Sequence, residues 1–220
     1  MIALCYPQKN EEEFIHLAQR LGYKEICFVY DERAAFQNTS LVNLKTNLKT
    51  SLAVYTGILN PKNMQKARQS FDLIFASKDF RFALEKQDVD IIVNQEIENS
   101  KDSIYQRQSG INHILCSIAE QRDKIVGLNF SLLLGKTKTE QAKIMGRFAQ
   151  NIFLCKKYKN KLAIFCFAEK PDELRSPNDI FSFFSLYGLS KMNNLLLLER
   201  IKYNQKRRSG KILAKGVEVE

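Results

Sequence analysis

Short apolar runs alternate with amphipathic segments along most of this chain, and the alternation limits the possible folds more than any single motif does. The apolar runs are rich in Ile, Val, Leu, Phe and Cys, which is typical of strands buried on both faces of a parallel sheet. Seven such runs occur, at residues 2–6, 25–30, 51–59, 72–76, 90–93, 125–130 and 162–167. Strands interleaved with helices predict an α/β protein.

Amphipathic segments between these runs predict helices. The longest, residues 139–158, places apolar residues at three- and four-residue spacing, and Thr137 stands three residues before Glu140, as in a capping box. Helices are predicted at residues 11–21, 61–69, 80–87, 139–158 and 177–187, and from 190 to about 208. The polar stretch 38–50 is interpreted as an irregular crossover.

Seven strand–helix repeats close either as a doubly wound open sheet or as a barrel with helices outside. An open nucleotide-binding sheet normally has a Gly-rich first turn, whereas the first turn here is Pro7-Gln8-Lys9-Asn10. We therefore predict an incomplete TIM-barrel-like fold of about seven parallel strands. It forms one domain over residues 1–220, with a basic C-terminal helix and tail at about 200–220.

Charge and cysteine content limit the partners and the compartment. Lys plus Arg number 34 against 24 Asp plus Glu, which gives a net charge of +10 and favours RNA, DNA or an acidic membrane surface as partner. The five cysteines are odd in number and widely spaced, as expected for buried thiols in a reducing compartment. With no signal-peptide pattern and no apolar run of about 18 residues, we expect a cytoplasmic protein without membrane association.

Residues 105–113 concentrate polar groups at the predicted start of a helix. Free backbone N–H groups and the helix dipole attract phosphate there. Ser109 could cap the helix, Gly110 permits close approach, and Arg107 could pair with a phosphate, while Asn112 and His113 add further donors. The alternative is an ordinary capped helix behind a solvated loop.

The same segment resembles a known family. Arg107-Gln108-Ser109-Gly110-Ile111-Asn112-His113 is similar to the Arg-x-Ser-Gly-Leu-Asn-His signature of ribonuclease P protein component 3, the archaeal counterpart of the thirty-kilodalton eukaryotic subunit. Residues 126–131, the turn 173–179 with Arg175, and the ending 204–208 and 216–219 also resemble this family, mainly over residues 90–220. Gln108 departs from the family, where a basic residue often precedes the signature Ser.

The resemblance implies a TIM-barrel-like fold that has kept a metallohydrolase-type barrel without its metal ligands. It implies a non-catalytic subunit of an endoribonuclease that removes the 5′ leader from precursor tRNA. The partners would be the catalytic ribonuclease P RNA and a small ferredoxin-like protein subunit, with precursor tRNA contacted indirectly. The protein itself would carry no cofactor, and the RNA would use Mg²⁺.

Basic residues outside the signature extend the predicted RNA-binding surface. Lys136 and Lys138 follow the sixth strand, where barrel proteins usually bind ligands, and Lys156 and Lys157 close the long helix, where they also suit the helix dipole. The C-terminal segment contains basic residues without evident compensating acids. We expect one positively charged face to clamp RNA backbone; besides residues 107–113, its members are Lys136, Lys138, Lys156, Lys157, Arg175, Arg200, Lys206, Arg207 and Arg208.

Two other functions remain open from the sequence. A barrel metallohydrolase acting on phosphoesters would use Asp90, Glu96 and His113, although the chain has only two histidines and we interpret Asp90, Glu96 and Glu98 as solvated loop charges. A generic scaffold for structured RNA would need only the basic surface. Cleavage by the protein alone would indicate the first function, and RNA binding without a processing role would indicate the second.

Overall fold

A single parallel sheet forms the centre of the protein. The computed structural model describes residues 1–37, 46–57, 60–86, 88–99, 101–189, 195–214 and 217–218. Neighbouring strands pair in the order β7-β6-β5-β4-β3-β2-β1-β8, and every pair is parallel. The strands are β1 (Ile2–Cys5), β2 (Glu25–Asp31), β3 (Lys49–Thr56), β4 (Leu73–Ala76), β5 (Ile91–Ile92), β6 (Ile125–Asn129), β7 (Lys161–Phe165) and β8 (Phe167–Ala168).

The sheet closes on itself through one bent strand. β7 and β8 are consecutive in the chain and are separated only by Cys166. β7 pairs with β6 on one side, and β8 pairs with β1 on the other, so this segment joins the two edges of the sheet. At the bend, the Asn129 side chain accepts a hydrogen bond from the Phe167 backbone N–H at 3.0 Å. The predicted TIM-barrel-like fold is confirmed, with eight parallel strands where about seven were expected, because the apolar run at 162–167 bends and contributes to both β7 and β8.

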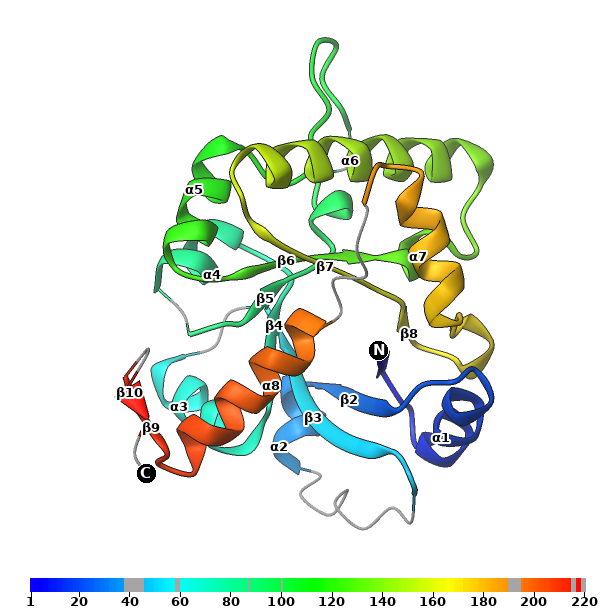
Figure 1. Cartoon of the computed structure of the whole chain (residues 1–220). Helices are drawn as coiled ribbons and strands as arrows, with labels where there is room; N and C mark the ends of the chain where they lie inside the picture. The colour runs from blue at the N-terminus through cyan, green and yellow to red at the C-terminus, as the bar shows by residue number, and fades with distance from the viewer. Residues whose placement is uncertain are drawn as a thin grey trace.

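Helices surround this barrel, as Figure 1 shows. They are α1 (Glu11–Arg20), α2 (Glu32–Gln37), α3 (Pro61–Ser70), α4 (Phe80–Lys86), α5 (His113–Gln121), α6 (Lys138–Lys157), α7 (Pro177–Ser185) and α8 (Leu195–Arg208). Short 3-10 turns η2 (Gln95–Ile97), η3 (Phe130–Leu133) and η4 (Pro171–Glu173) follow three of the strands, and β9 (Ile212–Ala214) pairs antiparallel with β10 (Val217–Glu218).

Most predicted helices are present within a few residues of their expected bounds. The capping box of α6 is confirmed, because the Thr137 side chain and the Glu140 side chain each bond to the other residue's backbone N–H. Helix α2 was not predicted. Of the expected crossover 38–50, residues 38–45 lie outside the described residues, as do residues 190–194 of the predicted last helix.

The barrel interior has its own apolar core, distinct from the layer between barrel and helices. Alternate residues of each strand point inward, as a pleated strand requires. Phe75 packs edge-on against Phe165 and Phe167, with ring centroids 6.2 and 5.8 Å apart. Gly127 leaves room for the Phe165 ring, because a Cβ at this position would lie 2.7 Å from that ring. The interior is therefore a packed core and not a channel.

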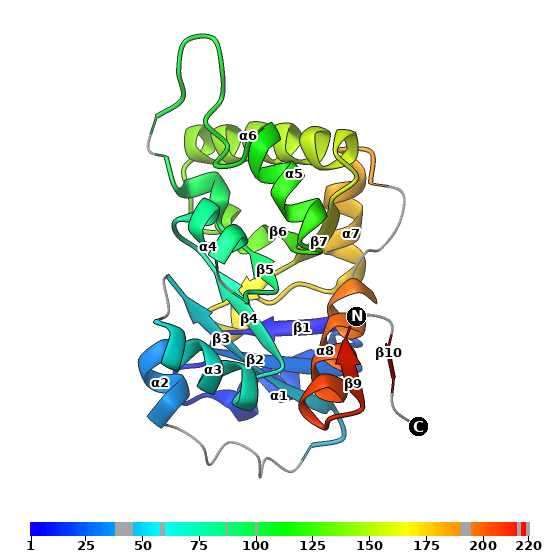
Figure 2. The same ribbon diagram turned by 90° about the vertical axis from the view of Figure 1, so that its left-hand side faces the viewer.

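Helix α8 covers the end of the barrel at which the strands begin. Its Leu197 and Ile201 are buried and belong to the interior core together with Ile2 and Leu73, which stand at the starts of their strands. Both views show α8 crossing the barrel near β4 (Figures 1 and 2). The C-terminal segment thus completes the core.

Two sequence-based expectations concern the rest of the chain. All five cysteines are buried and none forms a disulfide, which confirms the interpretation as buried thiols. Within the described residues, no helix is long and apolar enough to cross a membrane.

Candidate nucleic-acid interface

The signature segment lies in the long connection between β5 and α5, and a buried arginine of α6 anchors this connection. The Arg147 side chain is 2% exposed. It binds Asp102 through Nε and Nη2 at 2.9 and 2.6 Å, and its Nη1 donates to the backbone oxygens of Glu96 and Asn99 at 2.6 and 2.7 Å. Five donors in a rigid fork suit this task, because one side chain joins three points of the connection.

A second buried contact joins α6 to the signature itself. The Asn151 amide donates to the Glu96 carboxylate at 2.7 Å and to the Ser109 backbone oxygen at 3.0 Å, and Gln95 donates to the same carboxylate at 3.1 Å. Glu96 is fully buried, and this burial raises its pKa from the usual 4.5 to about 7, although the hydrogen bonds from Asn151 and Gln95 oppose the rise. Glu96 therefore ionises near neutral pH.

Two predictions about acidic and capping residues are wrong. Asp90 and Glu96 are 2% and 0% exposed, so they are not solvated loop charges, whereas Glu98 is exposed as expected. Ser109 is 1% exposed and does not cap α5; Asn112 does, by accepting a hydrogen bond from the Leu115 backbone N–H at 3.0 Å. The burial of Ser109 follows from the packing of its segment against η2.

Gly110 makes that packing possible. Its φ of +84° is left-handed, and a Cβ would overlap the Gln95 backbone oxygen and lie 2.7 Å from the Gln95 carbonyl carbon. The glycine thus permits a close approach between two segments of the protein, not between the loop and a ligand.

Arg107 is the signature residue best placed to meet a ligand. It is exposed, its backbone oxygen accepts a hydrogen bond from the Gln150 side chain at 3.1 Å, and its guanidinium lies against Gly146 of α6. A Cβ at Gly146 would overlap this guanidinium, so the glycine provides a seat for the arginine. Among the described residues, no carboxylate forms an ion pair with Arg107. His113, the first residue of α5, is exposed as well.

The other predicted basic residues divide into exposed and engaged groups. Lys136, Lys138 and Lys157 are exposed. Lys156 donates to the Gly188 backbone oxygen at 2.7 Å just after α7, and Arg175 donates to the Asp172 backbone oxygen at 2.6 Å. The last two side chains therefore stabilise neighbouring turns.

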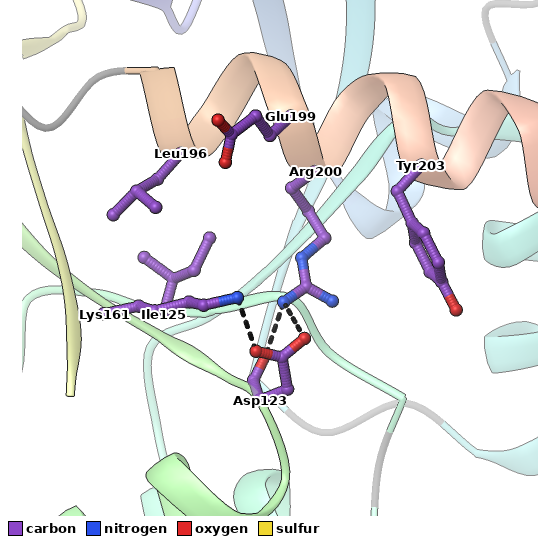
Figure 3. Close-up of a pocket in the computed structure, with 7 residues that line it drawn as sticks. All are labelled: Asp123, Ile125, Lys161, Leu196, Glu199, Arg200 and Tyr203. Atoms are coloured by element: carbon purple, nitrogen blue, oxygen red, sulfur yellow. Dashed lines mark hydrogen bonds and ion pairs between the residues drawn. The ribbon is translucent and has the colours of Figure 1, made fainter. Parts of the chain in front are cut away.

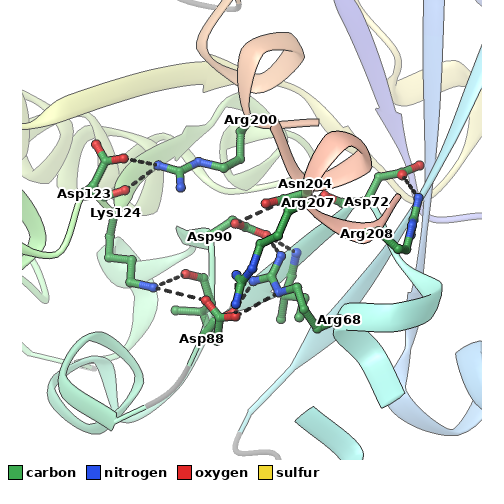
Figure 4. Close-up of polar contacts among 12 residues, drawn as sticks. Arg68, Asp72, Asp88, Asp90, Asp123, Lys124, Arg200, Asn204, Arg207 and Arg208 are labelled. Atoms are coloured by element: carbon green, nitrogen blue, oxygen red, sulfur yellow. Dashed lines mark hydrogen bonds and ion pairs between the residues drawn. The ribbon is translucent and has the colours of Figure 1, made fainter. Parts of the chain in front are cut away.

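The basic residues of α8 have acidic partners, contrary to prediction. Arg207 pairs with Asp88 at 3.0 Å, Arg208 with Asp72 at 2.6 Å, and Arg200 with Asp123 at 3.1 Å, as Figure 4 shows. Lys206 is exposed. RNA contact by these four residues stays a prediction, but three of the positive charges are already balanced within the protein.

Within the described residues, the predicted basic side chains do not share one face. Asp72, Asp90 and Asp123 lie one or two residues before β4, β5 and β6. The basic residues of α8, which contact these carboxylates or their neighbours, therefore lie at the amino ends of the parallel strands. Lys136 and Arg175 follow β6 and β8, at the carboxyl ends. The two groups of basic residues consequently lie at opposite ends of the barrel.

A small pocket under α8 offers no separate binding site. It has a volume of about 230 Å³ and lies between α8 and the starts of β6 and β7. Asp123, one of the two carboxylates that line the pocket, is paired with Lys161 at 2.6 Å as well as with Arg200 (Figure 3). The volume is below that of ordinary ligand pockets, and the two cations that line it, Lys161 and Arg200, are both paired with Asp123.

A metal centre is also not formed by the residues proposed for it. Asp90 precedes β5 and binds Arg68 at 2.8 Å, while Glu96 follows β5 in the buried network. The two carboxylates therefore lie at opposite ends of the barrel. In the described part of the chain, no three His, Cys, Asp or Glu side chains group as metal ligands would.

Sequence reasoning missed Arg147, Asn151 and Gly146 as organisers of this interface. A signal for the first two was present, because both interrupt the apolar stripe of residues 144–155 at helical spacing. Polar residues inside such a stripe are buried and must find partners.

Fold and surface together define a TIM-barrel-like protein that presents exposed basic side chains on a braced loop and helix. A model of the family described as RNase P subunit p30 matches residues 2–194. Ribonuclease P protein component 3 of Methanocaldococcus jannaschii is 31% identical over 189 residues, which cover 79% of this chain and 77% of that protein. The chain belongs to the RNase P subunit p30 family.

One further relative agrees with this assignment, and a solved structure shares the fold. Ribonuclease P protein component 3 of Methanococcus maripaludis strain C6 is 25% identical over 226 residues, which cover 95% of this chain and 94% of that protein. A chain from the cryo-EM structure of an archaeal ribonuclease P with mature tRNA has the same fold, with a TM-score of 0.75 at 23% identity over 100% of this chain and 97% of that chain. The predicted role as a ribonuclease P protein subunit is confirmed.

Proposed function

We propose that this subunit binds the catalytic RNA of ribonuclease P and stabilises the fold in which that RNA removes the 5′ leader from precursor tRNA. The solved relative was determined in a ribonuclease P that holds mature tRNA, which supports association with both RNAs. A small ferredoxin-like subunit would bind alongside. The RNA would supply the Mg²⁺-dependent chemistry, and the protein would hold no cofactor of its own.

The observation that carries this proposal is the state of Arg107. It is exposed, both polar groups of the peptide that joins it to Gln108 are hydrogen-bonded, and it has no carboxylate partner among the described residues, whereas Arg200, Arg207 and Arg208 are paired. A preorganised free guanidinium matches the geometry of a phosphate. Exposed Asn112, His113, Lys136 and Lys138 would add further contacts, and exposed Lys157, at the other end of the 20-residue helix α6 from Lys138, would meet a different part of the RNA.

Phosphate contacts position an RNA and contribute affinity that falls with salt. A protein of this kind would lower the Mg²⁺ concentration that the RNA needs, without providing a nucleophile. We place it in the cytoplasm, where the five buried free thiols would remain reduced.

The test is RNA binding across a salt series. Arg107→Ala should weaken binding to the cognate ribonuclease P RNA and reduce the slope of log affinity against log salt by about one. Arg20→Ala, at an exposed arginine in the last turn of α1, is the control and should leave the slope unchanged. An unchanged slope for Arg107→Ala would remove Arg107 from the interface.

Reconstitution tests the role itself. The protein, the small subunit and the RNA are mixed, and leader removal is followed over a range of Mg²⁺ beside a protein-only control. Activity that needs the RNA and appears at lower Mg²⁺ with this protein supports the proposal. Cleavage by the protein alone contradicts it.

A further inference from the structure

A narrow arm, residues 101–108, projects from the body of the protein beyond α6, as both views show (Figures 1 and 2). At its tip, Ile104 and Tyr105 are 93% and 97% exposed, more than any other large apolar side chain in the described ranges. Burying a tyrosine removes roughly 150–250 Å² of surface from water, so full exposure of an aromatic ring beside an isoleucine is unusual.

The arm is held in this position by its own hydrogen bonds. The Ser103 backbone N–H and side-chain hydroxyl both donate to the Gln106 backbone oxygen, at 3.0 and 2.7 Å, which closes a tight turn around the two tip residues. The Gln106 N–H in return donates to the Ser103 hydroxyl oxygen at 3.1 Å. The turn leaves Ile104 and Tyr105 at its outer end.

The base of the arm is anchored as firmly. The Asp102 carboxylate accepts hydrogen bonds from Arg147 and from the Gln108 N–H, the latter at 2.9 Å, and thereby joins the beginning and the end of the arm to α6. Although partial burial opposes it, hydrogen bonding from Arg147 and Gln108 lowers the pKa of Asp102, so this carboxylate stays ionised. Gln150 and the Gly146 seat hold Arg107 on the same helix. An arm braced at turn and base loses little conformational entropy when its tip binds.

Charge decides what kind of partner suits the tip. Asp102 is the one acidic residue between positions 101 and 108, and Arg147 neutralises it. Lys101 and Arg107 are exposed, and the remaining polar residues of the arm are uncharged. The arm that presents Tyr105 therefore carries net positive charge. Flat aromatic rings beside cations are the usual means of holding unpaired nucleotides, because the ring stacks on the base and the cation meets the phosphate.

We propose that the arm is a base-stacking element, in which Tyr105 stacks on an unpaired base of the ribonuclease P RNA while Arg107 holds a nearby phosphate. This inference rests on the proposed function, since it specifies where and how the RNA is bound. A hydrophobic pocket of a protein subunit is the competing occupant, and it would favour apolar volume over ring planarity.

Four substitutions separate stacking from apolar insertion. Tyr105→Phe keeps the ring and should bind the cognate RNA within about twofold of the wild type. Tyr105→Ala should lose about tenfold in affinity, within the range measured for single base stacks, and Tyr105→Leu should lose as much because it lacks a planar face. None of these changes should alter the salt slope, unlike Arg107→Ala. Unfolding temperatures should stay at the wild-type value, because the tip packs against nothing in the described chain.

A photo-crosslinking residue, p-benzoylphenylalanine, placed at position 105 in the reconstituted holoenzyme gives an independent result. A crosslink to one or a few unpaired nucleotides supports the proposal. A crosslink to a protein subunit alone, wild-type affinity for Tyr105→Leu, or wild-type affinity for Tyr105→Ala overturns it. Failure of the wild-type protein to bind the RNA would overturn the proposed function as well, so the two failures are distinguishable.

Discussion

Replacing Gly146 by alanine should make the protein more stable and worse at binding RNA. Gly146 lies inside α6, a 20-residue helix, where glycine costs about 1 kcal/mol relative to alanine. The added methyl group would overlap the Arg107 guanidinium, with Nε at 3.1 Å. Because the guanidinium is the end of a flexible side chain, the arginine should move while the helix stays.

The free energy of unfolding should therefore rise by about 0.5–1 kcal/mol in urea titrations. RNA affinity should fall by about two- to tenfold, because an unseated arginine must be ordered again on binding, at about 0.5–1.5 kcal/mol. The salt slope should change little, since the displaced side chain still reaches phosphate.

A double-mutant cycle isolates the cause. In the Arg107→Ala background, Gly146→Ala should still stabilise the protein but should have no further effect on RNA affinity. Ala142→Gly, one turn earlier on the exposed side of α6, is the matched control: it should lower stability by about 1 kcal/mol and leave affinity unchanged. If Gly146→Ala binds RNA with wild-type affinity, or loses the same affinity with and without Arg107, then Gly146 does not act by making room for the Arg107 guanidinium.

Two further changes probe the buried support of the signature. Gly110→Ala should lower the free energy of unfolding by more than about 3 kcal/mol, because the φ of +84° is left-handed and the added Cβ would overlap Gln95. The control Gly135→Ala, at φ +68° with open space around it, should lower the free energy of unfolding by only about 1–2 kcal/mol. Equal losses in urea titrations would contradict this reasoning. Burial raises the pKa of Glu96 to about 7 in the folded protein, whereas its usual value is 4.5. Between these pH values the folded state keeps a proton that the unfolded state has lost. The free energy of unfolding therefore falls as pH rises from 4.5 to 7, by up to about 3 kcal/mol. Glu96→Gln should remove this loss, and its stability relative to the wild type should grow from pH 5 to 7.5; a constant difference would show that Glu96 does not titrate there.

Local patterns in the sequence were sufficient for the strands, most helices and the α6 capping box. Each depends on residues a few positions apart, such as Thr137 and Glu140, whose interaction is set by helix geometry alone. The family could also be recognised, from the seven residues 107–113 together with the ordered matches that follow them in the chain.

The partners of the charged residues could not be predicted in this way. Arg208 meets Asp72 across 136 positions of sequence, and Arg147 meets Asp102 across 45. Such pairs exist only once the barrel has brought separate strands and helices together, so the α8 arginines looked uncompensated. Ser109 was misjudged for the same reason, because its burial comes from α6 and η2 and not from its neighbours in the chain.

The position of α8 has a consequence for how the protein is made. The helix that fills the open end of the barrel follows every barrel strand in the chain, so it leaves the ribosome after all of them. Until Leu197 and Ile201 arrive, the apolar side chains at the starts of β1 and β4 face water. A chain interrupted before α8 would expose the surface that chaperones and proteases recognise, and only molecules synthesised through this helix would persist to meet their RNA.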